Sequence, residues 1–190
     1  QDNLIGSGGN DSLLGGLDDD YLEGGEGDDV LEGDDGDDAI SGGAGADVLL
    51  GGDGADSMFS GDGNDYLDGG TGEDALSGNG GDDYLFGGAG RDALNGGAGA
   101  DLILGQGGDD NLQGGDGNDA MSGGDGNDFL KGDAGADVLN GGAGVDSANY
   151  HGSDAAVTVD LASQTASGGH ADGDMLTGIE SVRGSEFGDL

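Results

Sequence analysis

The chain has 190 residues and a formal net charge of −39, because 42 acidic residues stand against only three lysines and arginines. So few basic residues exclude nucleic acid as a partner, since a phosphate backbone would repel the chain. There is no cysteine for a disulfide or a thiolate metal site, and no apolar run reaches the length of a transmembrane segment. With 51 glycines and 4% aromatic residues, such a composition would indicate disorder if it had no repeat.

A nine-residue repeat runs without insertion or deletion from residue 6 to residue 149, which gives 16 frames. With Gly6 as place one, place eight is apolar throughout and weakens to Ala148 in the last frame. Place one is glycine in every frame except at Ser60, and place four is glycine except at Asp18. Place six is Asp in every frame: Asp11, Asp20, Asp29, Asp38, Asp47, Asp56, Asp65, Asp74, Asp83, Asp92, Asp101, Asp110, Asp119, Asp128, Asp137 and Asp146.

The places of the repeat predict a loop followed by a short strand. Glycine at places one and four indicates turn conformations with positive φ, which a Cβ would penalise. Places seven to nine predict a very short strand whose place-eight side chain points inward while its neighbours point outward. The loop directs carbonyl oxygens toward one point, and the place-six Asp adds a charged oxygen. Donors that are all oxygen favour Ca²⁺ or Mg²⁺ over zinc.

The frame from Gly87 to Asn95 reads GGAGRDALN and shows the pattern G-G-x-G-x-D-x-U-x. This pattern resembles the hemolysin-type calcium-binding repeat of repeats-in-toxin (RTX) proteins, and the resemblance covers roughly residues 1–149. The resemblance implies an all-β protein, a right-handed parallel β-roll in which two nonapeptides make one turn. The 16 frames would then form about eight turns.

Two frames in each turn would stack equivalent loops every 18 residues and place the Asp residues in two columns. Eight loops in each column leave seven gaps, so about 14 Ca²⁺ ions are expected, each between two Asp carboxylates and several loop carbonyls. These ions would bring roughly +28, which offsets most of the chain's negative charge. The expected carbonyl donors lie around Gly25, Gly27, Gly43, Gly45, Gly52, Gly54, Gly70, Gly72, Gly88, Gly90, Gly97, Gly99, Gly115, Gly117, Gly124 and Gly126.

Calcium is expected to drive folding. One buried leucine-sized side chain in nine residues contributes about 1.5–3 kcal/mol, whereas ordering nine residues costs on the order of 9–18 kcal/mol. The stacked carboxylates also repel one another. We therefore expect a disordered chain without calcium and a cooperative transition when calcium binds. The acidic residues at places three and five, such as Asp53 and Asp109, are expected to be mostly solvated.

The outward places seven and nine differ between the two predicted sheets. Odd-numbered frames place large apolar residues at 10 of these 16 positions, and even-numbered frames do so at only 3 of 16. The ten residues are Leu14, Val30, Val48, Leu50, Tyr66, Tyr84, Phe86, Leu102, Leu104 and Val138. We expect the odd-frame apolar sheet to dock against a protein partner or another domain. Strand propensity alone is the alternative explanation.

The register stops after residue 149, so residues 1–149 are predicted to form the repeat roll and residues 150–190 a C-terminal capping segment. Alternation of apolar and polar residues over 157–161 indicates a half-buried strand. Residues 169–176 look like a degenerate repeat around Asp174, for which a role in a turn is favoured over metal binding.

No catalytic constellation is present, because the two histidines, His151 and His170, belong to no recognisable motif. The chain is therefore predicted not to be an enzyme, although a parent protein could carry an enzyme domain elsewhere. The resemblance to RTX proteins implies export by type I secretion machinery and an extracellular or cell-surface location, within a toxin, an extracellular enzyme or a surface protein. The alternative is a calcium-rigidified spacer or adhesive segment of a large bacterial surface adhesin. Repeat-like sequence at both ends leads us to expect a piece of a longer protein.

Overall fold

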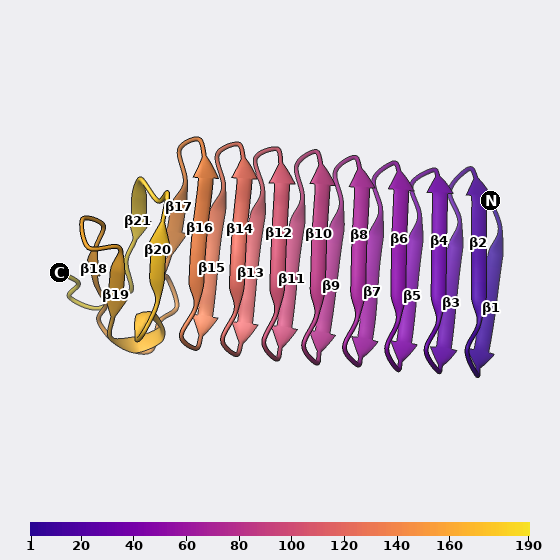
Figure 1. The fold of residues 1–190 in the computed structure, drawn as a ribbon, viewed down its shortest axis with the longest axis horizontal. Helices are drawn as coiled ribbons and strands as arrows, with labels where there is room; N and C mark the ends of the chain where they lie inside the picture. The colour runs from indigo at the N-terminus through magenta and orange to yellow at the C-terminus, as the bar shows by residue number, and fades with distance from the viewer.

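The computed structural model describes all residues from 1 to 190 and shows a parallel β-solenoid (Figure 1). Successive strands alternate between two sheets, and each repeat strand pairs in parallel with the strand two positions further along the chain. One sheet has the order β1-β3-β5-β7-β9-β11-β13-β15-β17-β21, and the other has the order β18-β19-β20-β16-β14-β12-β10-β8-β6-β4-β2. The predicted all-β parallel roll with two nonapeptides in each turn is confirmed.

Sixteen strands of equal length form the eight turns of the repeat region. They are β1 (Asn3–Gly8), β2 (Ser12–Leu17), β3 (Tyr21–Glu26), β4 (Val30–Asp35), β5 (Ala39–Ala44), β6 (Val48–Asp53), β7 (Ser57–Asp62), β8 (Tyr66–Thr71), β9 (Ala75–Gly80), β10 (Tyr84–Ala89), β11 (Ala93–Ala98), β12 (Leu102–Gly107), β13 (Asn111–Asp116), β14 (Ala120–Asp125), β15 (Phe129–Ala134) and β16 (Val138–Ala143). The structure contains no helix with the length and apolar character that crossing a membrane requires.

The core is a stack of place-eight side chains between the two sheets. Leu85 of β10 pairs in register with Leu67 of β8 and Ile103 of β12, so equivalent residues lie 18 positions apart. All three side chains are fully buried, and the core continues in the same way along the roll. The predicted inward direction of place eight is confirmed.

The strands are longer than predicted. Each one has six residues and runs from place seven to place three of the next frame, rather than ending at place nine. In β10 the backbone continues through Gly87 at place one, which is buried like Leu85 at place eight. A Cβ on Gly87 would lie 2.6 Å from the Asp92 Oδ2 and 2.9 Å from the Gly105 carbonyl oxygen. Glycine therefore permits the strand to approach the loop closely.

The prediction that glycine at place one has positive φ is wrong. Positive φ occurs instead at places two and four, for example 112° at Gly25 and 130° at Gly27. Residues other than glycine adopt it at these places too, including Asp34 at 75° and Asn79 at 68°. Asn and Asp tolerate this region better than other residues with a Cβ, so the turn conformation survives where glycine is replaced.

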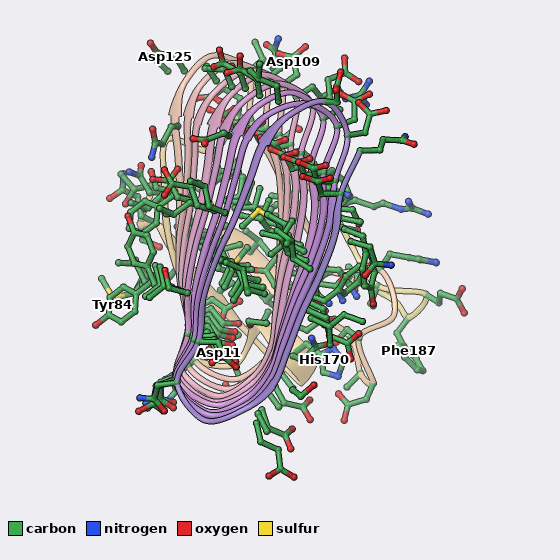
Figure 2. The ribbon with its side chains drawn as sticks, turned by 90° about the vertical axis from the view of Figure 1, so that its right-hand side faces the viewer. Asp11, Tyr84, Asp109, Asp125, His170 and Phe187 are labelled. Atoms are coloured by element: carbon green, nitrogen blue, oxygen red, sulfur yellow. The ribbon has the colours of Figure 1, made fainter.

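The even-numbered strands from β2 to β16 belong to one sheet, and their outward side chains form a partly exposed apolar face. Tyr84 is 52% exposed and projects from the flank of the roll (Figure 2). The rings of Tyr66 and Phe86, one turn apart, have centroids separated by 5.2 Å. The opposite sheet exposes Tyr21 and Phe59. The difference in outward residues between the sheets thus becomes a difference between two faces of the roll.

The last forty residues extend both sheets by one strand and add a hairpin at the yellow end of Figure 1. The last repeat frame ends with the short strand β17 (Ser147–Asn149). The elements that follow are β18 (Thr158–Asp160), β19 (Thr165–Ser167), the 3₁₀ helix η1 (Gly169–Ala171), β20 (Met175–Thr177) and β21 (Ser181–Arg183). β20 pairs in parallel with β16, and β21 pairs in parallel with β17. β18 and β19 are antiparallel and lie beyond β20. The roll therefore continues past the last regular frame.

Candidate metal centres

The place-six Asp residues lie in two columns inside the two bends of the roll, and Asp11 marks the first turn of one column in the end-on view (Figure 2). In each column the Oδ1 of one Asp accepts the backbone N–H of the Asp one turn earlier, as Asp47 does from Asp29 at 2.8 Å. This contact occurs at 14 places, at 2.7 to 2.9 Å. Every Asp of the set is buried except the half-buried Asp11.

The second carboxylate oxygen of each place-six Asp has no partner within the protein. All 16 Oδ2 atoms are buried and accept no hydrogen bond. A buried polar atom without a partner is costly, and a buried unpaired charge costs more. No lysine or arginine forms an ion pair with a place-six Asp, and Lys131 pairs with Asp133 outside the columns. A positive partner from solution would therefore stabilise the two columns of buried oxygens.

Burial also raises the pKa of several of these carboxyl groups. Burial, opposed by the Asp38 N–H and reinforced by the charge of Asp74, raises the pKa of Asp56 to about 7. Burial likewise raises the pKa of Asp137 to about 7, with Asp174 adding to the effect. Without a cation, Asp56 and Asp137 therefore hold their protons more tightly than free Asp does.

Backbone carbonyls at places two and four point from each turn toward the next. A Cβ built on Gly43 would overlap the carbonyl oxygen of Gly25, and one built on Gly45 would overlap that of Gly27. On Gly63 the same construction meets the Gly45 oxygen and lies 3.1 Å from the Asp65 Oδ1. The carbonyl oxygen of one turn and the Oδ1 of the following turn's Asp thus lie close to the same point between the turns.

The place-five carbonyl faces the other way. The peptide that joins Asp28 to Asp29 directs its N–H forward to Asp47. All peptides are trans, and in a trans peptide the N–H and C=O point in opposite directions. The Asp28 carbonyl is therefore directed back toward the preceding turn. Each gap between turns receives carbonyls from both sides.

The gaps have the chemistry of a calcium site. No cluster of three or more His, Cys, Asp or Glu side chains capable of holding a metal exists in the structure. Each gap is bordered by two carboxylates, so its remaining ligands would have to be backbone oxygens. A mixture of carboxylates and carbonyls, without nitrogen or sulfur, suits the six to eight oxygen ligands of Ca²⁺. The gaps therefore contain the oxygen atoms that the sequence pointed to, and their role as metal ligands stays a prediction.

Place five has a role that sequence reasoning missed. Nine frames carry Asp or Asn there, and all nine side chains accept the backbone N–H of the place-five residue one turn later, at 2.7 to 3.3 Å. Asp109 accepts from Asn127, and this contact lowers the pKa of Asp109. These side chains are exposed, as Asp109 is in Figure 2. The expectation that they are merely solvated was therefore incomplete.

Two further acidic residues continue the columns. Asp174 Oδ1 accepts the Asp137 N–H at 2.9 Å, and its Oδ2 accepts the Tyr150 hydroxyl at 2.9 Å. Glu180 accepts the Asp146 N–H at 2.8 Å. A signal for Asp174 existed, because glycine stands five residues before it and leucine two residues after it, as in the repeat. Glu180 follows Gly178 after only two residues, so the motif spacing could not identify it.

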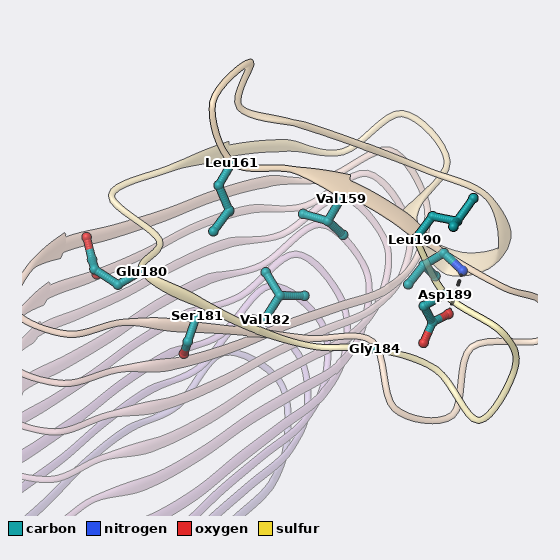
Figure 3. A pocket seen from close by; sticks show the side chains of 9 residues that line it. Val159, Leu161, Glu180, Ser181, Val182, Gly184, Asp189 and Leu190 are labelled. Atoms are coloured by element: carbon teal, nitrogen blue, oxygen red, sulfur yellow. Dashed lines mark hydrogen bonds between the residues drawn. The ribbon is translucent and has the colours of Figure 1, made fainter.

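A pocket near the C-terminal end lies between β18 and β21 (Figure 3). Its lining includes Val159 and Val182 and the carboxylates of Glu180 and Asp189. Glu180 already accepts the backbone N–H described above, and Asp189 accepts the Val157 N–H at 2.9 Å. Both carboxylates therefore hold the local fold together.

Comparison with known proteins agrees with this geometry. The family model of the RTX calcium-binding nonapeptide repeat, which comprises four copies, matches residues 1–31, 32–67, 59–94, 68–103, 87–121, 95–130 and 113–148. No curated protein matches the chain. The matches together span more than half of the sequence, and they coincide with the strands and Asp columns described above. The chain belongs to the family of RTX calcium-binding nonapeptide repeat proteins.

Proposed function

We propose that the roll binds about 14 Ca²⁺ ions, one in each gap between successive place-six Asp residues, and that this binding folds the chain. The 16 Asp carboxylates would supply the charged ligands, and the carbonyls at places two, four and five would complete each shell. The observation that carries the proposal is the set of buried Oδ2 atoms without partners. The repeats of the family are calcium-binding, which supports the proposal.

We propose that the column of ions that runs along Asp11 to Asp137 ends before Asp174, because of the Tyr150 hydroxyl. It donates to the Oδ2 of Asp174, so this oxygen differs from the 16 that have no partner. The hydroxyl gives this buried oxygen the partner that a calcium ion would supply in the other gaps. We therefore count no ion in the gap between Asp137 and Asp174.

A calcium titration monitored by far-UV circular dichroism, with equilibrium dialysis to count ions, tests the proposal. We expect a cooperative transition from coil to β-structure and about 14 bound ions. Magnesium at the same concentration serves as the control, because its small octahedral shell is poorly matched to carbonyl-rich gaps. A chain that is fully folded in chelator, or that binds no calcium, would contradict the proposal.

We also propose that the protein is exported from the cell before it folds. Membership of the RTX family supports export by type I secretion machinery as an unfolded chain, followed by folding in the calcium-rich extracellular medium. A fusion to a type I export signal, expressed with and without the exporter, would test this. We expect the fusion in the medium only when the exporter is present, and protease-resistant only after calcium is added.

A second candidate function is a rigid spacer or adhesive segment in a large surface adhesin. The constant 18-residue register over eight turns favours it, because the calcium-bound roll would be a straight rod. Force spectroscopy would distinguish the readings: a spacer should resist extension in calcium and lengthen readily in chelator.

The apolar face formed by the even-numbered strands from β2 to β16 is the proposed docking surface for a partner domain or protein. Tyr84 and Phe86 lie near its centre, and Phe59 on the opposite sheet provides a matched control. We expect Tyr84→Ser with Phe86→Ser to abolish binding of an apolar surface probe, and Phe59→Ser to leave it largely intact. If the double substitution and Phe59→Ser reduced probe binding equally, strand propensity alone would explain the apolar residues.

A further inference from the structure

We propose that the Asp and Asn side chains at place five are positioning residues for calcium, because each holds in place the place-four carbonyl of the following turn. This inference rests on the calcium function proposed above. The residues concerned are Asn10, Asp19, Asp28, Asp37, Asn64, Asp82, Asp109, Asn118 and Asn127.

The mechanism follows from a single peptide group. Asp82 Oδ1 accepts the backbone N–H of Ala100 at 2.8 Å, so this N–H is directed back toward the preceding turn. The same peptide carries the Gly99 carbonyl, which must point in the opposite direction because the peptide is trans. A Cβ built on Gly117 in the next turn would overlap the Gly99 oxygen, which confirms this direction. The Gly72 and Gly90 carbonyls, whose peptides have no place-five acceptor, point the same way. The Asp82 contact therefore does not create the direction of the Gly99 carbonyl; we infer that it holds this proposed calcium ligand in place.

The two ladders of side chains act in opposite directions. Place-six carboxylates accept an N–H from the preceding turn, as Asp101 does from Asp83 at 2.9 Å. Place-five side chains accept an N–H from the following turn. Together they hold the peptides on both sides of the place-five residue, with the place-four carbonyl pointing forward and the place-five carbonyl pointing back. One loop thus presents oxygens to both of its gaps.

The charge of the place-five side chain is not the property that matters. Four of the nine residues are Asn, and their contacts have the same geometry, as in the 2.9 Å bond from the Ala136 N–H to the Asn118 Oδ1. An attraction for cations would require Asp, whereas an acceptor requires only an oxygen at this reach.

The ladder is interrupted where place five lacks this acceptor. Glu73 and Arg91 stand at place five in consecutive turns of one column, and neither accepts an N–H from the turn that follows. The N–H groups of Arg91 and Asp109 consequently have no partner in the protein. At Arg91, a substitution by Asn could therefore create the missing hydrogen bond to the Asp109 N–H.

The loss experiment compares two variants of equal charge. Five Asp residues at place five are changed together to Asn in one variant and to Ala in the other: Asp19, Asp28, Asp37, Asp82 and Asp109. Alanine occupies place five naturally at Ala46 and Ala55, so the loop backbone accepts it. If each lost bond lowers the overall binding constant about fivefold, five bonds spread over about 14 ions raise the calcium midpoint about 1.8-fold. We expect this rise for the Ala variant relative to the Asn variant.

The local readout is the ¹³C carbonyl shift of Gly99. In the wild type and in Asp82→Asn it should change on calcium binding, and in Asp82→Ala the change should shrink. The gain experiment compares Arg91→Asn with Arg91→Ala, which also have equal charge; only Arg91→Asn should slow exchange of the Asp109 amide. Identical behaviour of the Asn and Ala variants in all three tests would overturn the inference. Absence of calcium binding by the wild type would instead overturn the proposed calcium function.

Discussion

The substitution Asp101→Asn tests the assignment of the carboxylates most directly. Asp101 stands between Asp83 and Asp119 in its column and therefore borders two gaps. Asparagine retains Oδ1, which accepts the Asp83 N–H, but it replaces the partnerless Oδ2 with an amide NH₂ that cannot bind a cation. We expect the variant to keep its backbone contacts and to lose two ions.

The expected loss of stability follows from this geometry. At a calcium concentration tenfold above the dissociation constant, each bound ion stabilises the fold by about 1.4 kcal/mol. Two lost ions then lower the free energy of unfolding by about 2.8 kcal/mol at that concentration. Asp11→Asn should lose only one ion, because Asp11 borders the single gap to Asp29 in the regular column.

Equilibrium dialysis would count the ions, and urea unfolding at fixed calcium would measure the stability. Asp116→Asn is the matched control, since Asp116 is exposed at place three and its carboxylate makes no hydrogen bond. An unchanged ion count in Asp101→Asn, or a loss equal to that in Asp116→Asn, would refute the assignment of ions to the gaps.

Three further outcomes follow from the structure. Gly69→Ala should raise the calcium midpoint strongly, because its Cβ would lie 2.6 Å from the Gly87 carbonyl oxygen, whereas Gly80→Ala, with no atom nearer than 3.8 Å, should leave the calcium titration unchanged. Tyr150→Phe should leave the Asp174 Oδ2 without its donor, so dialysis should count about one additional ion. In chelator, acid should favour the fold: because burial raises the pKa of groups such as Asp56 to about 7, the calcium-free roll gains stability as the pH falls from about 7 toward 4, and circular dichroism would follow this change.

The strict repeat made much of the fold predictable. A fixed Asp and a fixed apolar residue in every frame predicted the two columns and the core, since 18-residue stacking follows once two frames form a turn. Strand length was underestimated because glycine was interpreted as a turn residue. At Gly87 it is an extended residue whose missing side chain admits the Asp92 carboxylate. Sequence indicates where glycine is required, but not whether φ or space requires it.

The hydrogen bonds of place five were beyond the sequence argument for a different reason. Alternation among Asp, Asn and Ala looks like tolerance on an exposed surface, and only the stacked backbone reveals that Asp and Asn share an acceptor that Ala lacks. Glu180 illustrates a similar limit. Its loop is three residues shorter than a regular one, and the longer side chain of glutamate restores the contact to the Asp146 N–H.

The distribution of charge links folding to calcium. A chain of net charge −39 stacks its carboxylates in two buried columns and has only three lysines and arginines with which to balance them. Burial of 16 oxygens without partners opposes the fold, whereas the ladder bonds and the place-eight core favour it. About 14 calcium ions would supply roughly +28 at the positions where the charge is concentrated. Because the counter-charge comes from solution, the calcium concentration outside the protein should determine whether the roll forms.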